Sequence, residues 1–441
     1  MLPSSHSAAA PGGLRRVLGL GFGLAVIVGS TLGIGILRTP GLVAGQLPSP
    51  TAVLLVWIVG GLYTLVGAVC FAELGTMLPK EGGYYVYARH AFGDTIGFAV
   101  GWTDWLAYCC VLGYVSIGFA EFVRILLPSL APPVTAVAVT VLVGLVALQW
   151  AGVQVSSRFQ QAATGVKFLA FLVLVFAAFA IHGISIAPDS SAPTASAAGM
   201  VFALQAVVIT FGGWQSALYF SEEDRSPEAN IPRSMIGGVV AVIVIYLLIN
   251  VALLSLLPLG DLARSTLPAA DAAGVLVGPS GHLIITVLSL ISLPPMLNAI
   301  IMIGTRILFA MGRDGLFWRK TATIGAGGTP TVAMLVTTAV AVAGIITGTF
   351  QRLVAFTAFF LVLDYAICCL ALIVLRRREP ERPRPFRAWG YPWTAGIVFA
   401  GAVALVIGTL VGDTANGAGA LALLAVGLVG HAAFGRPRRP S

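Results

Sequence analysis

The sequence predicts an all-α, multi-pass membrane protein with twelve transmembrane helices. Hydrophobic residues make up 58% of its 441 residues and charged residues only 10%. Mean hydropathy is +0.96, which a soluble domain of this length would not show. A helix of about 20 apolar residues crosses the roughly 30 Å hydrocarbon layer of a bilayer. Twelve stretches are long enough: about 17–46, 51–78, 94–126, 133–153, 159–182, 199–223, 235–257, 283–310, 331–348, 353–375, 391–412 and 417–435.

Basic residues divide unequally between alternate loops. With the N-terminus inside, the inner loops and tails hold 19 of the 25 Lys and Arg residues, the outer segments hold 4, and 2 lie within spans. Lys and Arg are retained on the cytoplasmic side of membrane proteins. We therefore expect a protein of the cell (inner) membrane with both termini in the cytoplasm, and the net charge of +8 requires no nucleic-acid partner.

The loops are mostly short, so we expect one membrane domain built from two halves. Each half begins with a glycine-interrupted span, and an odd number of spans per half inverts the second half relative to the first. Segments 11 and 12 fall outside this repeat. The predicted bounds are 1–14 for a disordered cytoplasmic N-terminus, 15–435 for the transmembrane domain, 15–182 for repeat 1, 199–375 for repeat 2, 391–435 for helices 11 and 12, and 436–441 for a cytoplasmic tail.

Glycines interrupt the first predicted span near its middle. Glycine tolerates non-helical dihedral angles and lets the backbone approach a ligand closely. Non-helical backbone at membrane depth survives only inside protein or beside a water-filled cavity. A second half-helix starting near Ile36 would present free N–H groups, which suit a carboxylate; close helix packing through small residues is the alternative explanation. The candidate substrate-binding residues here are Ser30, Thr31, Gly33, Ile34 and Gly35.

A similar break interrupts the sixth span at residues 211–215. Carbonyl groups at the end of its first half-helix would suit an ammonium group, so the two breaks together match the carboxylate and the amine of an α-amino acid. Phe211 and Trp214 could shape or gate the cavity, whereas core packing is the alternative role for Trp214. The candidate residues at this break are Ile209, Phe211, Gly212, Gly213 and Trp214.

Five separated motifs occur in order over about residues 15–395. They are Gly33-Ile34-Gly35-Ile36-Leu37; Ala72-Glu73-Leu74-Gly75 with Lys80-Glu81-Gly82-Gly83-Tyr84; residues 209–215 followed by Glu222-Glu223 and Asn230-Ile231-Pro232-Arg233; residues 306–316; and Arg384-Pro385-Phe386 with Gly390-Tyr391-Pro392. In these motifs the chain resembles the amino acid–polyamine–organocation transporters, closest to the L-type amino acid transporter branch. The resemblance implies a five-plus-five inverted repeat with broken helices 1 and 6, and alternating access.

Two positions depart from the family's pattern. Ile34 stands where the family often has Ser or Thr, which removes a hydroxyl group but keeps the backbone N–H. Ile209 stands at the aromatic position that covers bound substrate in relatives. A smaller gate is therefore expected here, with consequences for specificity rather than for the backbone cradle.

Lys167 is the most informative charge within a span. It lies nine residues after Arg158, which corresponds to a depth of about 13 Å at about 1.5 Å per residue. An ammonium at that depth is costly and by default functional; snorkelling to the inner interface is the alternative. In sodium-independent relatives a lysine of the fifth helix fills the space of a sodium ion between helices 1 and 8. Lys167 resembles that lysine, which implies that it holds the first break in shape.

Acidic residues also fall within apolar spans. Asp104 and Asp364 are candidate coupling residues, either as proton carriers or as partners of buried polar groups. Glu121 has Arg124 at i+3, which favours a surface ion pair. Glu222 and Glu223 follow the second break, and we expect them to contact Arg225 or Arg233.

These observations favour a secondary active transporter for amino acids that is independent of sodium and either proton-coupled or an exchanger. No acidic residue lies at either break to bind a cationic side chain, so a neutral amino acid is favoured. The alternative is a polyamine or cationic amino acid transporter that uses Asp104 or Asp364. A non-transporting amino acid sensor is a third possibility. The chain is not expected to be an enzyme, since its five His residues are scattered over tails, loops and span ends.

The expected partners are small. They are an amino acid substrate, membrane lipid and, in the proton-coupled case, protons; no cofactor and no metal ion is expected. All five cysteines fall in predicted spans, and none falls in an outer loop. We therefore expect no disulfide-linked accessory subunit of the kind that related exchangers often use.

Overall fold

The computed structural model describes residue 14 and residues 16–186, 196–325 and 327–434. Apart from Leu14, the predicted N-terminal segment 1–14 lies outside the described residues, as does the predicted tail 436–441. The described part is all-helical and contains no β-strand; its one isolated β-bridge joins Leu18 to Asp224.

The helices follow one another closely. In chain order they are α1 (Leu20–Thr31), α2 (Ile34–Ala44), α3 (Pro50–Met77), α4 (Tyr84–Phe92), α5 (Asp94–Leu126), α6 (Val134–Trp150), α7 (Val153–His182), α8 (Ala197–Thr210), η1 (Ser216–Phe220), α9 (Pro227–Leu256), α10 (Leu259–Arg264), α11 (Pro268–Val277), α12 (Ser280–Arg313), η2 (Arg319–Ala322), α13 (Thr331–Thr347), α14 (Phe350–Arg378), α15 (Trp393–Gly412) and α16 (Thr414–Phe434).

The predicted all-α multi-pass class is confirmed. Among the described residues, eight helices are long and apolar enough to cross a membrane, and the bent pair α1–α2 makes a ninth candidate span. The three remaining predicted segments correspond to the shorter apolar helices α6, α8 and α13. The count of twelve crossings and the division into two repeats therefore remain predictions.

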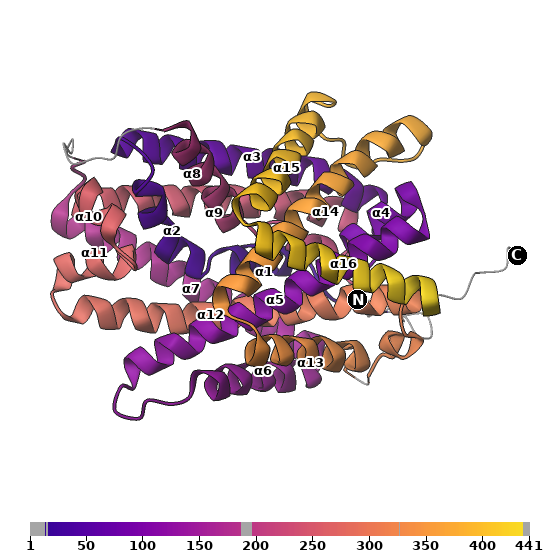
Figure 1. Cartoon of the computed structure of the whole chain (residues 1–441), viewed down its shortest axis with the longest axis horizontal. Helices are drawn as coiled ribbons and strands as arrows, with labels where there is room; N and C mark the ends of the chain where they lie inside the picture. Colours follow the sequence, from indigo (N-terminus) through magenta and orange to yellow (C-terminus); the bar gives the residue numbers. More distant parts are fainter. Residues whose placement is uncertain (1–13, 15, 187–195, 326, 435–441) are drawn as a thin grey trace, which may run out of the picture.

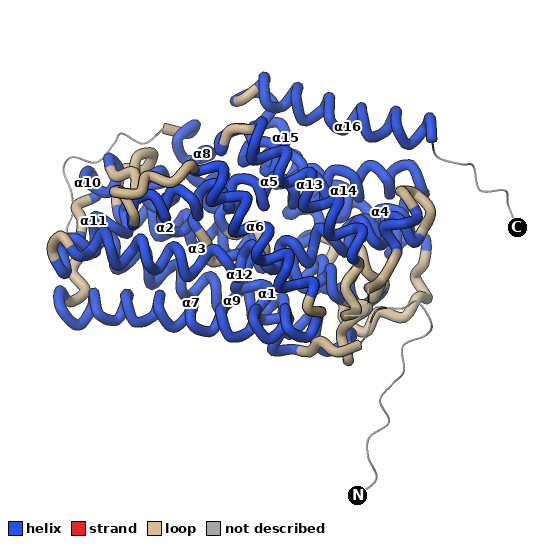
Figure 2. The backbone as a smooth tube through the Cα atoms, turned by 90° about the horizontal axis from the view of Figure 1, so that it is seen from below, coloured by secondary structure: helices blue, strands red, loops and turns tan. Residues whose placement is uncertain are grey.

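The long helices run side by side along the longest axis of the molecule (Figure 1). Helices α10 and α11 lie at one end and α4 lies at the other, which we call the inner end (Figure 1). Arg378, in the last turn of α14, donates to the carbonyl oxygen of Ala91 in α4, so the basic segment after α14 also belongs to the inner end. In Figure 2, α16 lies along one edge of the bundle. That the inner end faces the cytoplasm is an expectation from loop charge.

Candidate functional site

The first break lies between α1 and α2, whose axes differ by 46°. Leu32 has an extended backbone, and Gly33 (φ −146°, ψ −153°) starts the second half-helix, so α2 begins at Ile34 rather than near Ile36. No side chain caps α2 at its N-terminus, and the buried Thr31 Oγ1 has no hydrogen-bond partner in the described part of the chain. Free N–H groups at a helix N-terminus carry partial positive charge. This break therefore offers donors to an anionic group.

The second break follows α8. Residues 211–215 form turns and lead into the short 3-10 helix η1. Gly213 has a φ of +114°, which a residue with a side chain rarely adopts. The carbonyl oxygens of Val207, Ile209 and Thr210 at the end of α8 each accept one hydrogen bond, from Phe211, Gly212 and Tyr246. A carbonyl oxygen has two lone pairs, so this break still offers acceptors to a cationic group.

The two breaks touch each other through Ser30. Its hydroxyl lies 2.7 Å from the hydroxyl of Ser216 and 3.1 Å from the carbonyl oxygen of Gly213. A Cβ atom on Gly213 would lie 2.8 Å from the backbone carbonyl carbon of Ser30. Only glycine permits this approach, because two backbones meet without room for a side chain.

Tyr246, on α9, also joins the two breaks. Its hydroxyl lies 2.8 Å from the carbonyl oxygen of Thr31 and 3.2 Å from that of Thr210, so its single hydrogen is shared between the ends of α1 and α8. Beside it, the hydroxyl groups of Thr39 and Thr210 lie 2.8 Å apart. Reasoning from the sequence missed Tyr246, although a tyrosine inside an apolar span signals a buried hydroxyl group that needs a partner.

The remaining candidate residues at the breaks surround these contacts. Ile34 is buried, and a Cβ on Gly35 would meet the methyl group of Thr210 at 3.0 Å. A Cβ on Gly33 would lie 2.8 Å from Sδ of Met296, on α12. Gly212 lies in the turn, where a Cβ would meet only the carbonyl oxygen of Ile209. Ile209 itself is 42% exposed.

The two aromatic candidates pack into separate clusters. The ring of Phe211 lies 5.0 Å from that of Tyr246 and 6.1 Å from that of Trp57. The ring of Trp214 lies 5.2 Å from that of Phe71 and 5.5 Å from that of Tyr365. Both side chains are buried, so in this conformation they form walls behind the breaks rather than an open lid.

Lys167 lies wholly inside the bundle. Its ammonium Nζ donates to the carbonyl oxygens of Gly29 on α1 and Ser292 on α12, both at 3.0 Å. Two turns earlier on α7, Gln160 Nε2 donates to the carbonyl oxygen of Ala25, and Gln160 Oε1 accepts from the side-chain amide of Asn298 on α12. Buried polar groups thus join α1 to α7 and α12 directly before the first break.

Asp104 and Asp364 are both buried but have different partners. Both carboxylate oxygens of Asp104 accept from the Tyr219 hydroxyl, at 2.8 and 3.0 Å. One oxygen of Asp364 accepts from Thr103 at 2.9 Å, and the other has no hydrogen-bond partner among the described residues. Asp104 therefore contacts η1 directly after the second break, whereas Asp364 contacts Thr103 on α5.

The ion-pair partners expected for three glutamates were wrong. Glu121 pairs with Arg38 at 3.7 Å rather than with Arg124. Glu222 pairs with Arg313 at 2.8 Å, and Glu223 pairs with Arg306, rather than either glutamate with Arg225 or Arg233. In each case the partner comes from another helix, which spacing along one segment cannot indicate.

Comparisons with known proteins agree with this architecture. A family model described as an amino acid permease matches residues 23–430. The chain is 28% identical over 421 residues to a serine/threonine exchanger of Bacillus subtilis (strain 168), covering 91% of this chain and 93% of that protein.

Two mammalian proteins are also similar. The mouse Asc-type amino acid transporter 1 is 28% identical over 387 residues, covering 85% of this chain and 73% of that protein. The mouse large neutral amino acids transporter small subunit 2 is 27% identical over 402 residues, covering 87% of this chain and 75% of that protein. The family model spans both helix breaks and nearly all of the described bundle. The chain therefore belongs to the amino acid permease family, a family of transporters rather than enzymes.

Proposed function

We propose that this member of the family binds a neutral amino acid between the two helix breaks and carries it across the cell membrane by alternating access, without sodium. The observation that carries the proposal is the contact between Ser30, in the last turn of α1, and Gly213, in the turn after α8, beside the uncapped N-terminus of α2. An α-amino acid has one anionic and one cationic group at a fixed separation. The two breaks offer donors and acceptors side by side, so they match both groups.

The carboxylate would bind at the start of α2. Backbone N–H groups of the first turn after Gly33 and the unpaired hydroxyl of Thr31 are the donors available there. The ammonium would bind at the carbonyl groups that end α8. In this arrangement Ser30 and Gly213 set the spacing between the two groups, and Tyr246 fixes the carbonyls of Thr31 and Thr210.

A neutral side chain fits the charges around the breaks. Asp104 already accepts from Tyr219 through both oxygens. Asp364 is held through Thr103 on α5. Among the described residues, neither carboxylate hydrogen-bonds to residues 29–35 or 209–215, which supports a neutral rather than a cationic side chain.

Sodium independence rests on Lys167. A cation held between α1 and α12 would be bound by carbonyl oxygens. Lys167 puts its own ammonium against the carbonyls of Gly29 and Ser292. The Lys167 ammonium would thus occupy the position of a sodium ion, and its positive charge would repel a sodium ion from that position.

Exchange is the transport mode to test first, with serine and threonine, because the bacterial relative is named a serine/threonine exchanger. Another relative is named as a small subunit. Here all five cysteines are buried, which supports a transporter that works without a disulfide-linked partner. We also keep the proposal that both termini face the cytoplasm.

Thermal stabilisation of the purified protein tests the substrate. A ligand that binds only the folded state stabilises it by about 2.7 kcal/mol at a hundred times its Kd. We expect stabilisation by a few neutral amino acids, and exchange of those same amino acids in proteoliposomes without sodium. Stabilisation by putrescine or agmatine alone would instead favour a polyamine transporter.

A further inference from the structure

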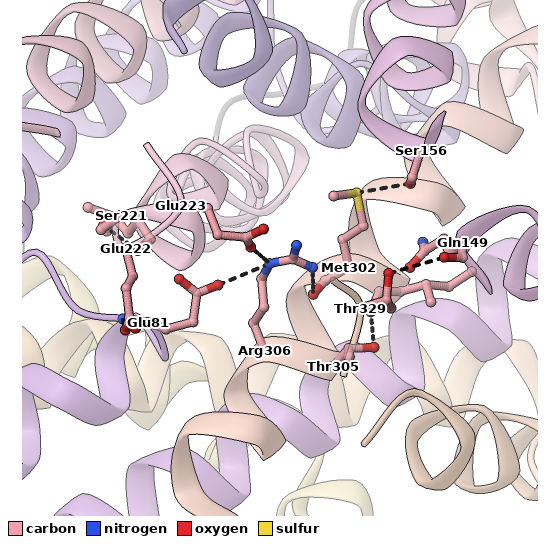
Figure 3. A network of polar contacts seen from close by, with 12 residues as sticks. Glu81, Gln149, Ser156, Ser221, Glu222, Glu223, Met302, Thr305, Arg306 and Thr329 are labelled. Atoms are coloured by element: carbon pink, nitrogen blue, oxygen red, sulfur yellow. Dashed lines mark hydrogen bonds and ion pairs between the residues drawn. The ribbon is translucent and has the colours of Figure 1, made fainter. Parts of the chain in front are cut away.

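A cluster of buried charges lies at the inner end, apart from the helix breaks, and Figure 3 shows Arg306 directed toward Glu81 and Glu223. It consists of Glu81, in the loop after α3, Glu223, in the loop after η1, and Arg306, on α12; we call it the inner cluster. Each side chain is at most 1% exposed. Nε of Arg306 lies 3.0 Å from Glu81 Oε1 and 2.5 Å from Glu223 Oε1.

The inner cluster has fewer donors than its two carboxylates need. Nε of a guanidinium carries one hydrogen, and that of Arg306 donates to Glu223. A second nitrogen of Arg306 donates to the carbonyl oxygen of Met302, while the ring of Phe220 covers the guanidinium. Both oxygens of Glu81 and the second oxygen of Glu223 lack a hydrogen-bond donor in the described part of the chain.

One bound proton would supply a missing hydrogen-bond donor to the two carboxylates. A buried ionised carboxylate without donors is strongly disfavoured. Burial and the charge of Glu223 raise the pKa of Glu81, and the charge of Arg306 only partly opposes them. A protonated carboxyl group is itself a donor, and the carboxyl groups of Glu81 and Glu223 approach the same nitrogen, so one can donate to the other.

Three other acidic groups near the inner cluster already have partners. Glu222 accepts from Arg313 at 2.8 Å and from the backbone N–H of Glu81 at 3.3 Å. Asp314, which follows α12, pairs with Arg89 on α4. Asp224 accepts from the backbone of Ser226 and the amide of Asn230. The three glutamates and two arginines, Glu81, Glu222, Glu223, Arg306 and Arg313, reach zero net charge with one bound proton.

The inner cluster also fastens the segments that alternating access must separate. Leu18, just before α1, donates to the carbonyl oxygen of Glu223, and Arg225 donates back to that of Leu18, both at 3.0 Å. The start of the first span, the segment after the second break and the loop after α3 are thus all held against α12. Opening the inner end requires these contacts to separate and would admit water to Glu81 and Glu223.

We propose that Glu81 holds a proton, directed toward Glu223, while the inner end is closed, and that Glu81 releases this proton to water when the inner end opens. The inference rests on the proposed function, since it adds a proton-binding site to the transport cycle. The closed state binds the proton more tightly, so acidification stabilises the closed state and rising pH favours opening. For one proton, this equilibrium shifts by up to about tenfold per pH unit.

Chemical labelling of the inner end tests the proposal. Ser221 is buried beside the cluster, and Ser226 is exposed nearby. All five native cysteines are buried. The protein is placed in nanodiscs and labelled with a membrane-impermeant maleimide. The labelling rate of Ser221→Cys is divided by the labelling rate of Ser226→Cys. This ratio reports opening, because both rates share the pH dependence of thiol reactivity. We expect this ratio to rise severalfold between roughly pH 5.5 and 7.5, because a carboxyl group with a raised pKa loses its proton as the pH rises above the acidic range.

Glu81→Gln should make the ratio independent of pH, because the amide stays neutral. The control Glu228→Gln removes an exposed carboxylate of α9 and should keep the rise. If Glu81→Gln fails to fold, Glu223→Gln replaces it with the same expectation, since its side-chain amide can donate to Glu81, which then needs no proton as a donor. A pH-independent ratio in the parent chain, or an unchanged rise in the glutamine variant, would overturn the proposal. Serine exchange by the parent chain at one fixed pH tests the proposed function separately.

Discussion

The ammonium of Lys167 donates a 3.0 Å hydrogen bond to the carbonyl oxygen of Gly29, two residues before α1 ends at Thr31. A second bond of equal length to Ser292 ties the same ammonium to α12. The first half-helix therefore cannot move relative to α12 without breaking a charged, buried contact. This places Lys167 at the joint between a segment expected to move and the scaffold against which it moves.

Replacing Lys167 by alanine should abolish amino acid uptake while the protein still reaches the membrane. The carbonyl oxygens of Gly29 and Ser292 would lose a buried donor, which costs about 1–3 kcal/mol, and the first break would lose its fixed geometry. Uptake and surface expression are measured together. Lys320→Ala is the control, because Lys320 is an exposed lysine outside the spans. Undiminished uptake by Lys167→Ala would remove Lys167 from the mechanism.

A leucine at Gly33 should block substrate binding. Already its Cβ would lie 2.8 Å from Sδ of Met296, so the larger side chain must fill the space at the start of α2. Thermal stabilisation by the best neutral amino acid should disappear. Gly165→Leu is the matched control, since Gly165 is exposed on α7 and a Cβ there meets nothing within 4 Å.

Gly212→Leu extends this test to the second break. It should also abolish substrate binding, because the leucine side chain would project from the turn after α8 into the proposed substrate space. Normal affinity in both Gly33→Leu and Gly212→Leu would show that substrate binds elsewhere.

The breaks could be predicted from the sequence because glycine spacing is a local property of a span. The contacts between residues far apart in the sequence could not be predicted. Glu223 was expected to pair with an arginine a few residues away, yet its partner Arg306 lies 83 positions along the chain. Likewise, Tyr246 belongs to the long apolar helix α9, and only the rotation of that helix in the bundle directs the hydroxyl toward the breaks. Such contacts follow from tertiary packing, which one sequence does not specify.

Phenylalanine at position 246 should weaken substrate binding without unfolding the protein. The Tyr246 hydroxyl holds the carbonyl oxygens of Thr31 and Thr210. A hydrogen bond of this kind contributes about 1 kcal/mol, so we expect the Kd to rise roughly fivefold. Tyr63→Phe is the control because its hydroxyl donates to the carbonyl oxygen of Val398, between α3 and α15. Equal affinities in the two variants would exclude a role for Tyr246 in shaping the site.

Glu73→Ala should destabilise the fold more than any change at the helix breaks. Glu73 is fully buried near the end of α3, where it accepts from Arg376 Nε at 2.8 Å and from the backbone N–H of Ala388 at 2.7 Å, and lies 3.2 Å from Arg384 Nε. Removing one partner of a buried ion pair costs about 3–5 kcal/mol, because the remaining charges lose their counter-ion.

The prediction for Glu73 is a marked fall in melting temperature with affinity retained in whatever protein remains folded. Glu228→Ala removes an exposed carboxylate and should leave the melting temperature unchanged. A stable Glu73→Ala variant with lost affinity would contradict a structural role. It would instead link the end of α14 and the segment after it to the substrate site, since Arg376 and Arg384 would then be acting through α3 on the breaks rather than holding the inner end together.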